Sequence, residues 1–150
     1  MLSALLPNTE PFGAKVPMLT PEAWPDLVTN GPDWALIGDA AGFVDPITGE
    51  GIYYAIRSGE LFARTILEGG STSDYARVWR LDFGEDLAAA SRYYNRFYRG
   101  RFLGASFVDR AIQFSRVHAG VRRVMRRALG GEQSYVTLKR DLVLGAAGLA

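Results

Sequence analysis

The sequence contains no cysteine and only one histidine, His118. A chain without thiols has no disulfide framework, no thiolate metal site and no cysteine nucleophile. With a single histidine, the sequence also predicts neither a histidine-based metal centre nor a hydrolytic triad. The absence of cysteine fits a cytoplasmic protein, where disulfides are rare.

The sequence also lacks the long apolar run, of roughly 18 residues or more, that a membrane-spanning helix requires. Its first residues, MLSALLPNTEPFG, have neither the basic start nor the apolar segment of a signal peptide. We therefore expect a cytoplasmic protein. Apolar residues make up 48% of the 150 residues, which is enough to bury the core of one modest domain or part of a larger one.

The charges are unevenly distributed along the chain. Residues 1–75 hold three Lys/Arg and ten Asp/Glu, whereas residues 76–150 hold fourteen Lys/Arg and six Asp/Glu. The basic half could attract an anionic partner, or the two halves could pair with each other.

The most basic stretch, RVHAGVRRVMRR, places arginines among valines and a methionine at helical spacing. This pattern is typical of a helix on an anionic membrane surface or beside a diphosphate group, and also of an ordinary solvated face. No nucleic-acid recognition motif accompanies it, so we expect no nucleic-acid partner. The stretch is therefore either an ordinary solvated face or a site of peripheral membrane contact through Arg122, Arg123, Arg126 and Arg127.

Proline and turn-forming residues dominate residues 1–33, where only short extended pieces fit, at Ala14–Leu19 and Leu27–Thr29. The continuous apolar run Trp34–Ile37 then predicts a short buried strand that ends at Gly38.

Helical periodicity follows over most of the remaining chain. Residues at helical spacing predict a helix over 51–68 with an apolar face of Ile52, Ala55, Ile56, Gly59, Phe62, Ala63 and Ile66. Glu60 and Arg64 are an expected i,i+4 ion pair on its other face. A second helix is expected from a serine cap at Ser71 or Ser73 towards Tyr98, with an apolar stripe of Tyr75, Val78, Trp79, Leu87, Ala90, Tyr94 and Phe97. Further helices are expected at about 104–117, 119–129 and 134–144.

The stretch GDAAGFVDPITGEGI, residues 38–52, combines an acid, glycines and a proline between the predicted strand and helix. Asp39 would lie at the carboxyl end of the strand, where α/β sheets bind ligands, and an ionised carboxylate suits a ligand hydroxyl. Small residues such as Gly42 allow a ligand to approach the backbone, and Pro46 stiffens the loop. Gly49 and Gly51 open the helix, whose first N–H groups and positive dipole end suit an electron-rich ring edge.

These residues resemble a known motif. The stretch GDAAGFVDPITGEGIYYAIRSGE is similar to the second flavin-binding motif of FAD-dependent oxidoreductases with the p-hydroxybenzoate hydroxylase type of fold, and within that group it most resembles the geranylgeranyl reductase family. The later YVTLKRDL, residues 135–142, is similar to that family's C-terminal pattern. The resemblance is clear over residues 34–69.

The resemblance implies roles for individual residues. Asp39 would accept a hydrogen bond from the ribityl chain of FAD, and Gly51 and Ile52 would present backbone N–H groups to the flavin ring edge. Gly49 and Pro46 would shape the loop beside the isoalloxazine. Gly38 would allow the turn out of the strand.

The family's N-terminal G-x-G-x-x-G unit is absent from this sequence. The resemblance therefore implies the C-terminal portion of such an enzyme, of α/β class, present here as an α+β fragment. Residues 1–33 would be the end of a substrate-domain sheet or a connector, residues 34–70 would end a GR2-type FAD-binding domain, and residues 71–150 would form a helical C-terminal region.

The implied activity is reduction of carbon–carbon double bonds of an isoprenoid chain through FAD, with NADPH or another reductant as electron donor. The alternatives are an FAD-dependent monooxygenase or halogenase on the same scaffold, and a non-catalytic helical fragment that binds a membrane or a partner protein.

Glu50 and the aromatic residues of the later helices each have two possible roles. Glu50 is either a functional carboxylate near the flavin or a residue that favours the helix N-terminus. The aromatic residues of the later helices either line a channel for a long apolar substrate or form a helix core: Tyr93, Tyr94, Phe97, Tyr98, Phe102 and Phe107.

Overall fold

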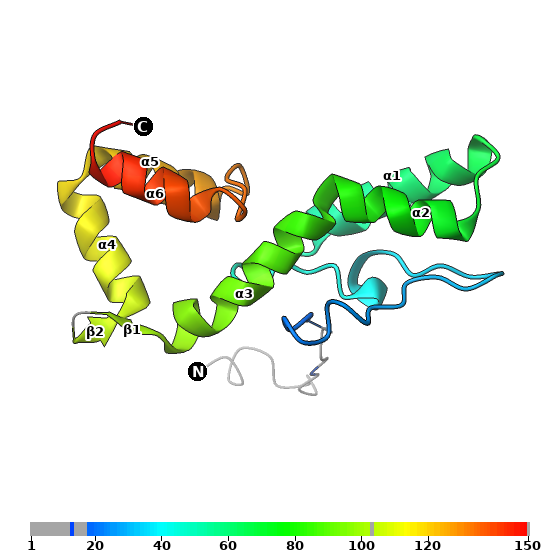
Figure 1. Cartoon of the computed structure of the whole chain (residues 1–150), viewed down its shortest axis with the longest axis horizontal. Coiled ribbons are helices and arrows are strands. Elements are labelled where there is room, and N and C mark those ends of the chain that lie inside the picture. Colours follow the sequence, from blue (N-terminus) through cyan, green and yellow to red (C-terminus); the bar gives the residue numbers. More distant parts are fainter. Residues whose placement is uncertain (1–12, 14–17, 103, 150) are drawn as a thin grey trace, which may run out of the picture.

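The structure is a computed structural model and describes residue 13 together with residues 18–102 and 104–149 (Figure 1). The helices are α1 (Ile52–Leu67), α2 (Thr72–Trp79), α3 (Glu85–Arg99), α4 (Phe107–Val117), α5 (Ala119–Leu129) and α6 (Leu138–Ala146). A 3-10 turn η2 (Gly38–Ala41) precedes α1, and a π-helical turn η3 (Arg80–Gly84) joins α2 to α3. Strands β1 (Arg101–Phe102) and β2 (Ala105–Ser106) form an antiparallel hairpin. The described chain is thus mostly helical with one small sheet, consistent with an α+β fragment.

A single long helical rod connects the two ends of the molecule. It begins at Ser71, whose side chain accepts from the Asp74 amide while the Asp74 carboxylate accepts from the Ser71 amide. This capping box confirms the predicted start, and it lowers the pKa of Asp74 to about 2 because the carboxylate accepts these bonds. The rod continues through α2, the π turn and α3, and Figure 1 shows α3 running obliquely between the α1–α2 half and the α4–α6 half.

The main core lies between α1, α2, η3 and the segment that precedes α1. Its fully buried members include Phe43, Leu61, Tyr75 and Trp79, and the Phe43 ring centroid lies 4.6 Å from that of Trp79. The Trp79 indole N–H donates to the buried Thr29 hydroxyl at 3.0 Å. These contacts tie the N-terminal segment to α2, as the predicted apolar stripe of this helix requires.

The predicted strand at Trp34–Ile37 is wrong. This segment forms only one isolated bridge, between Ala35 and Asn30, and Trp34 and Ile37 are 48% and 42% exposed. A β-strand needs a neighbouring strand to pair with, and among the described residues this segment pairs only with Asn30, across a tight turn. Leu27–Thr29 is likewise not a strand, and residues 14–17 of the predicted piece Ala14–Leu19 lie outside the described residues.

The predicted apolar face of α1 is only partly correct. The residues that α1 buries fully are Tyr54, Ser58, Leu61 and Thr65. Of the predicted stripe, Phe62 is half-buried and packs against the main core, whereas Ile52 and Ile56 are 72% and 69% exposed. Hydrogen bonds made by buried Ser58 and Thr65 compensate for their polarity on the packed side.

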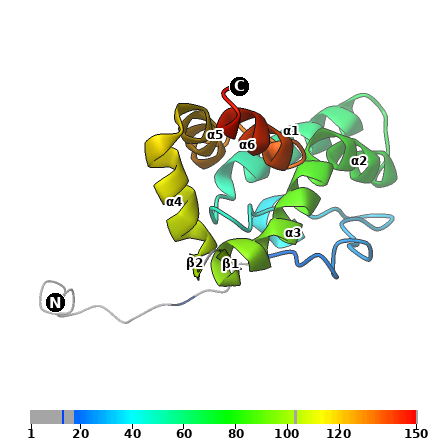
Figure 2. The same cartoon turned by 60° about the vertical axis from the view of Figure 1, so that its left-hand side comes forward.

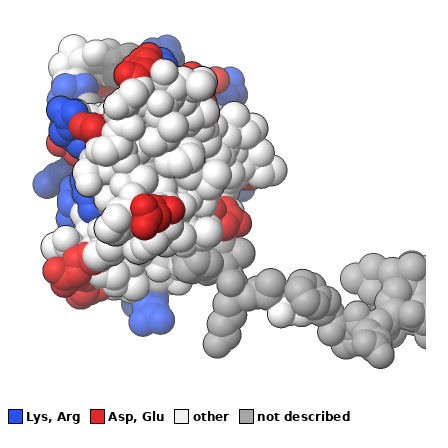
Figure 3. Space-filling model, turned by 90° about the vertical axis from the view of Figure 1, so that its right-hand side faces the viewer, with Lys and Arg blue, Asp and Glu red and all other residues white. Residues whose placement is uncertain are grey.

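A broad, weakly charged surface also lies at the α1–α2 end of the molecule, as Figure 3 shows. Apolar residues that are exposed in this part of the chain include Val28, Trp34, Ile66 and Leu67.

The predicted Glu60–Arg64 pair is replaced by a different one. The Arg57 guanidinium binds Glu60 at 2.8 Å, and its Nε donates to Asp82 of the π turn at 2.9 Å. The arginine therefore links α1 to η3, and its hydrogen bonds lower the pKa of Asp82.

The last three helices form a second packed unit, seen from the side in Figure 2. They confirm the three predicted helices apart from shifts at their ends, whereas the 101–106 hairpin was not predicted. Helix α6 packs against α5, and α4 packs against α5. A Cβ on Gly120 would lie 2.3 Å from the Gly145 carbonyl oxygen, so α5 and α6 approach closely because both positions are glycine. No helix in the described part of the chain is both long and apolar enough to cross a bilayer.

Candidate functional site

An open hollow of about 490 Å³ lies at the N-terminus of α1. The residues that line it come from η2, the loop before α1 and the first turn of α1: Ile37, Gly38, Asp39, Gly49, Glu50, Gly51, Ile52 and Ala55. Five of the six predicted cofactor residues are therefore brought together here. The sixth, Pro46, is buried in the loop and does not line the hollow.

The carboxylate of Asp39 lies directly against the backbone of Gly51. A Cβ at position 51 would be 2.5 Å from Asp39 Oδ1, so only glycine leaves this carboxylate in place. Gly38 has a φ of +53°, and its amide donates to the buried Ser58 hydroxyl at 2.9 Å. These contacts fix η2 against α1 and present Asp39 at the surface of the hollow.

The first turn of α1 has unused backbone donors. No side chain caps Gly51, and the first intrahelical bond runs from the Ala55 amide to the Gly51 carbonyl. The amides of Ile52 and Tyr53 thus have no acceptor within the helix. An acceptor-only carboxylate beside free amides and a positive helix end fits a ligand that carries both hydroxyl groups and an electron-rich edge.

Gly49 and Glu50 also line the hollow, the first through its backbone conformation and the second through its charge. Gly49 has a φ of +77°, and a Cβ there would meet no heavy atom within 4 Å, so its backbone conformation rather than crowding requires glycine. Glu50 is exposed and lines the hollow, which places a second carboxylate beside the helix end.

The loop that leads into α1 is organised by Asp45. One carboxylate oxygen of this buried residue accepts from the amides of Ile47 and Thr48, at 2.7 and 3.2 Å. The Asp45 backbone binds the loop's other end, since its amide donates to the Glu50 carbonyl and its carbonyl accepts from Gly49. Sequence analysis assigned no role to Asp45, although an aspartate before a proline turn is typical of a loop with this bonding.

The second oxygen of the Asp45 carboxylate accepts from Tyr135. The Tyr135 hydroxyl donates to it at 2.8 Å in a buried contact. Burial raises the pKa of Tyr135, and so do the hydrogen bond to Asp45 and the charge of that residue. The YVTLKRDL segment, which carried part of the family resemblance, thus packs against the loop of the first motif.

Asp86 of α3 anchors the same segment from the other side. Its Oδ1 accepts from the Ser134 hydroxyl at 2.6 Å and from the Tyr135 amide at 2.7 Å. The C-terminal segment is therefore held by two acids, one on the motif loop and one on α3.

A second, mainly apolar cavity of about 500 Å³ lies between α3, α4, α5 and α6. Ile47 and Thr48 of the motif loop form part of its wall. Of the six aromatic residues expected in a channel or a core, Tyr93, Phe97 and Phe107 line this cavity. Tyr94 and Tyr98 do not line it, and the side chain of Phe102 lies outside the described part of the structure.

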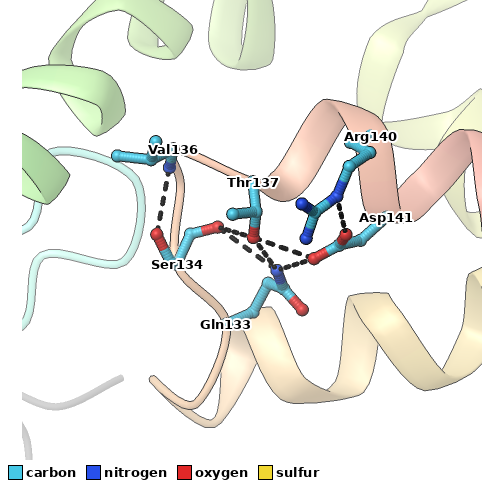
Figure 4. Close-up of polar contacts among 6 residues, drawn as sticks. All are labelled: Gln133, Ser134, Val136, Thr137, Arg140 and Asp141. Carbon is cyan, nitrogen blue, oxygen red and sulfur yellow. Dashed lines mark hydrogen bonds and ion pairs between the residues drawn. The ribbon is translucent and has the colours of Figure 1, made fainter.

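The turn between α5 and α6 is closed by a polar cluster (Figure 4). The Gln133 amide nitrogen donates to Asp141 Oδ2 at 2.8 Å and to the Thr137 hydroxyl at 3.0 Å. Hydrogen bonds from Gln133, Thr137 and Arg140 hold the pKa of Asp141 at about 2. The described residues contain no cluster of acids and histidine that could hold a metal ion, and His118 stacks on Phe114 at the α4–α5 junction.

No family model and no solved structure matches the chain. Several curated proteins are similar to parts of it. A menaquinone reductase of Mycolicibacterium smegmatis is 51% identical over 49 residues, which is 33% of this chain and 12% of that protein. A chloroplastic geranylgeranyl diphosphate reductase of Arabidopsis thaliana is 33% identical over 85 residues, which is 50% of this chain and 18% of that protein.

A tryptophan 2-halogenase of Chondromyces crocatus is 35% identical over 74 residues, which is 49% of this chain and 12% of the halogenase. The matched stretches thus span less than a fifth of each of these relatives. Together the partial relatives suggest the FAD-dependent oxidoreductase superfamily that the motif of residues 38–52 resembles.

Proposed function

We propose that this chain carries the flavin-ring side of an FAD-dependent oxidoreductase, and that the reaction is reduction of a carbon–carbon double bond in an isoprenoid chain. The observation that carries the proposal is the hollow at the N-terminus of α1, which gathers Gly38, Asp39, Gly49, Gly51 and Ile52. The reductases among the partial relatives favour a reduction.

Each group in the hollow has a task that its chemistry suits. The Asp39 carboxylate accepts a hydrogen bond from a hydroxyl of the ribityl chain. The amides of Gly51 and Ile52, at the positive end of α1, stabilise the negative charge that a reduced flavin carries at its pyrimidine edge. Gly49 and the buried Pro46 keep the loop beside the ring free of bulk.

Bound FAD would supply the redox chemistry, by accepting electrons from NADPH or another reductant and passing hydride to the double bond. The chain's own contribution is to bind and orient the cofactor and to stabilise its charge. Residues 1–33 would be the end of a substrate-domain sheet or a connector, residues 34–70 would belong to the FAD-binding domain and residues 71–150 to a helical C-terminal region.

The test is a titration of the purified chain with FAD, followed by the change in flavin absorbance. We expect saturable binding that Asp39→Ala weakens by about tenfold or more, since a hydrogen bond to a charged group contributes about 1.5–3 kcal/mol. Asp33→Ala, which removes an exposed acid outside the hollow, is the control and should bind like the wild type. No binding by either form would refute the idea that this chain holds a flavin site. Equal binding by Asp39→Ala and the wild type would refute the placement of the flavin in this hollow.

A second candidate is an oxygen-dependent reaction on the same site, hydroxylation or halogenation, which the partial match to a tryptophan 2-halogenase favours. The two candidates are distinguished once FAD is bound and reduced under anaerobic conditions. Reoxidation by an isoprenoid without oxygen supports reduction, whereas reoxidation only by oxygen supports the second candidate.

A further inference from the structure

The cavity between α3, α4, α5 and α6 is separate from the hollow that would hold the flavin. Its wall is mostly apolar, and the residues that line it include Phe97, Phe107, Phe114, Met125 and Leu142. At about 500 Å³ it falls within the range of roughly 300–1,000 Å³ that is typical of small-molecule sites. An apolar cavity of this size suits one extended hydrocarbon chain.

The charged residues of the wall all have the same sign. Arg96, Arg110 and Lys139 line the cavity, and no aspartate or glutamate of the described residues does. Arg110 also donates to the Gln113 side chain at 2.7 Å, which holds its guanidinium in place at the edge of α4. Positive side chains beside an apolar interior complement a ligand that has an apolar chain and an anionic end.

We propose that this cavity binds a single hydrocarbon chain that ends in an anionic group, with the chain among the aromatic residues and the anionic end at Arg96, Arg110 and Lys139. The identification of this ligand with the isoprenoid substrate rests on the proposed function. Binding itself requires no flavin.

The motif loop relates this cavity to the hollow. Ile47 and Thr48 line the cavity, and Gly49, Glu50 and Gly51, the next residues of the loop, line the hollow. The amides of Ile47 and Thr48 are bonded to Asp45. A hydrocarbon chain in the cavity would therefore contact Ile47 and Thr48 of the loop, while a ligand in the hollow would contact the next three residues.

The test uses the flavin-free chain and a fluorescent fatty acid, cis-parinaric acid, as the probe. Farnesyl monophosphate and farnesol then compete for the probe, since they share a hydrocarbon chain and differ in the anionic group. We expect both to displace the probe, the phosphate about tenfold more strongly, because two or three partly exposed charge contacts each contribute up to about 1 kcal/mol. Failure of either compound to displace the probe, or equal strength of the two, would overturn the proposal.

Two variants test the location. Arg96→Gln/Lys139→Gln should remove most of the preference for the phosphate and leave the affinity for farnesol unchanged. Ala128→Phe, which adds bulk to the cavity wall, should weaken both compounds. The control is Arg92→Gln/Arg99→Gln, which removes two exposed arginines of α3 that do not line the cavity and should bind like the wild type.

Amide hydrogen exchange gives a location that does not depend on substitution. Farnesyl monophosphate should slow exchange at Ile47 and Thr48 and leave the amides of α2 unchanged. Protection confined to other parts of the chain would overturn the proposal. The two proposals can fail separately, because this assay contains no flavin. If the protein binds farnesyl monophosphate but not FAD, this inference stands and the proposed function is refuted. If it binds FAD but not farnesyl monophosphate, only this inference is refuted.

Discussion

The Tyr135 hydroxyl donates to the Asp45 carboxylate across 90 positions of sequence, and the contact is buried. It joins the two segments on which the family resemblance rests, one before α1 and one before α6. The same carboxylate holds the amides of Ile47 and Thr48, so the tyrosine supports a loop that lines both cavities.

Tyr135→Phe should destabilise the protein by about 1–3 kcal/mol, because it leaves a buried carboxylate oxygen without its donor. Denaturant unfolding followed by circular dichroism measures the change in the free energy of unfolding. Tyr94→Phe is the control, since no hydrogen bond involves its hydroxyl within the described residues. Equal unfolding midpoints for both variants would show that the Asp45 contact does not hold the C-terminal segment in place.

Stability should fall when the pH rises above 10. Burial raises the pKa of Tyr75 to about 12, and it also raises the pKa values of Tyr54 and Tyr135. A raised folded-state pKa favours the protonated form in the native state. This contribution is present in full below the unfolded-state pKa of about 10 and is lost as pH rises towards the folded-state value. Unfolding midpoints in urea should therefore be constant between pH 8 and 9 and drop between pH 10 and 12, whereas a constant midpoint over the higher interval would contradict the assignment.

Gly51→Ala should weaken FAD binding because the added Cβ would lie 2.5 Å from Asp39 Oδ1 and would displace that carboxylate. Gly59 in the middle of α1 is the matched control, since a Cβ there would meet no heavy atom within 4 Å. We expect Gly59→Ala to stabilise the protein by about 0.5–1 kcal/mol and to leave FAD affinity unchanged. The prediction fails if both alanines have the same effect on the flavin titration.

The chain should bind vesicles that contain anionic lipid, and Arg122, Arg123, Arg126 and Arg127 should carry this binding. All four are exposed on α5, whereas Val121 and Val124 on the other side of the helix are buried. The contact would therefore be electrostatic rather than an insertion of the helix, at about 1 kcal/mol per arginine, and high salt should abolish it.

Co-sedimentation measures this binding. Replacement of the four arginines by glutamine should remove it, whereas Arg92→Gln/Arg99→Gln on α3 should retain it. Binding that persists in high salt, or that survives the fourfold replacement, would exclude this surface.

Local sequence signals predicted the features that depend on neighbouring residues. The start of α2 at Ser71 could be predicted because the cap depends on Asp74, only three residues away. The clustering around α1 followed from a short strand–loop–helix motif, even though the strand itself did not form. What could not be predicted depends on contacts between distant segments: the Tyr135–Asp45 bond, the Asp86 anchor and the close crossing of Gly120 and Gly145.

The orientation of α1 illustrates the limit of periodicity. The helix has apolar residues on one side and a buried set of Tyr54, Ser58, Leu61 and Thr65 on another. A periodic pattern locates the apolar side but does not say which neighbour covers it. Here α2 and η2 cover the side with the buried hydroxyls, and Ile52 and Ile56 remain at the surface.

The π turn at Arg80–Gly84 accommodates one extra residue in the helical rod. A π turn contains one residue more than an α-helical turn, and one residue of an α-helix corresponds to a rotation of about 100°. Because the wider turn takes up the extra residue, α2 and α3 keep their packed faces without this rotation. Deletion of the exposed Leu81 would therefore convert the rod into a regular helix, remove no core side chain and leave Tyr135 against Asp45. The contact between the motif loop and the C-terminal segment thus tolerates a change of chain length at this one turn.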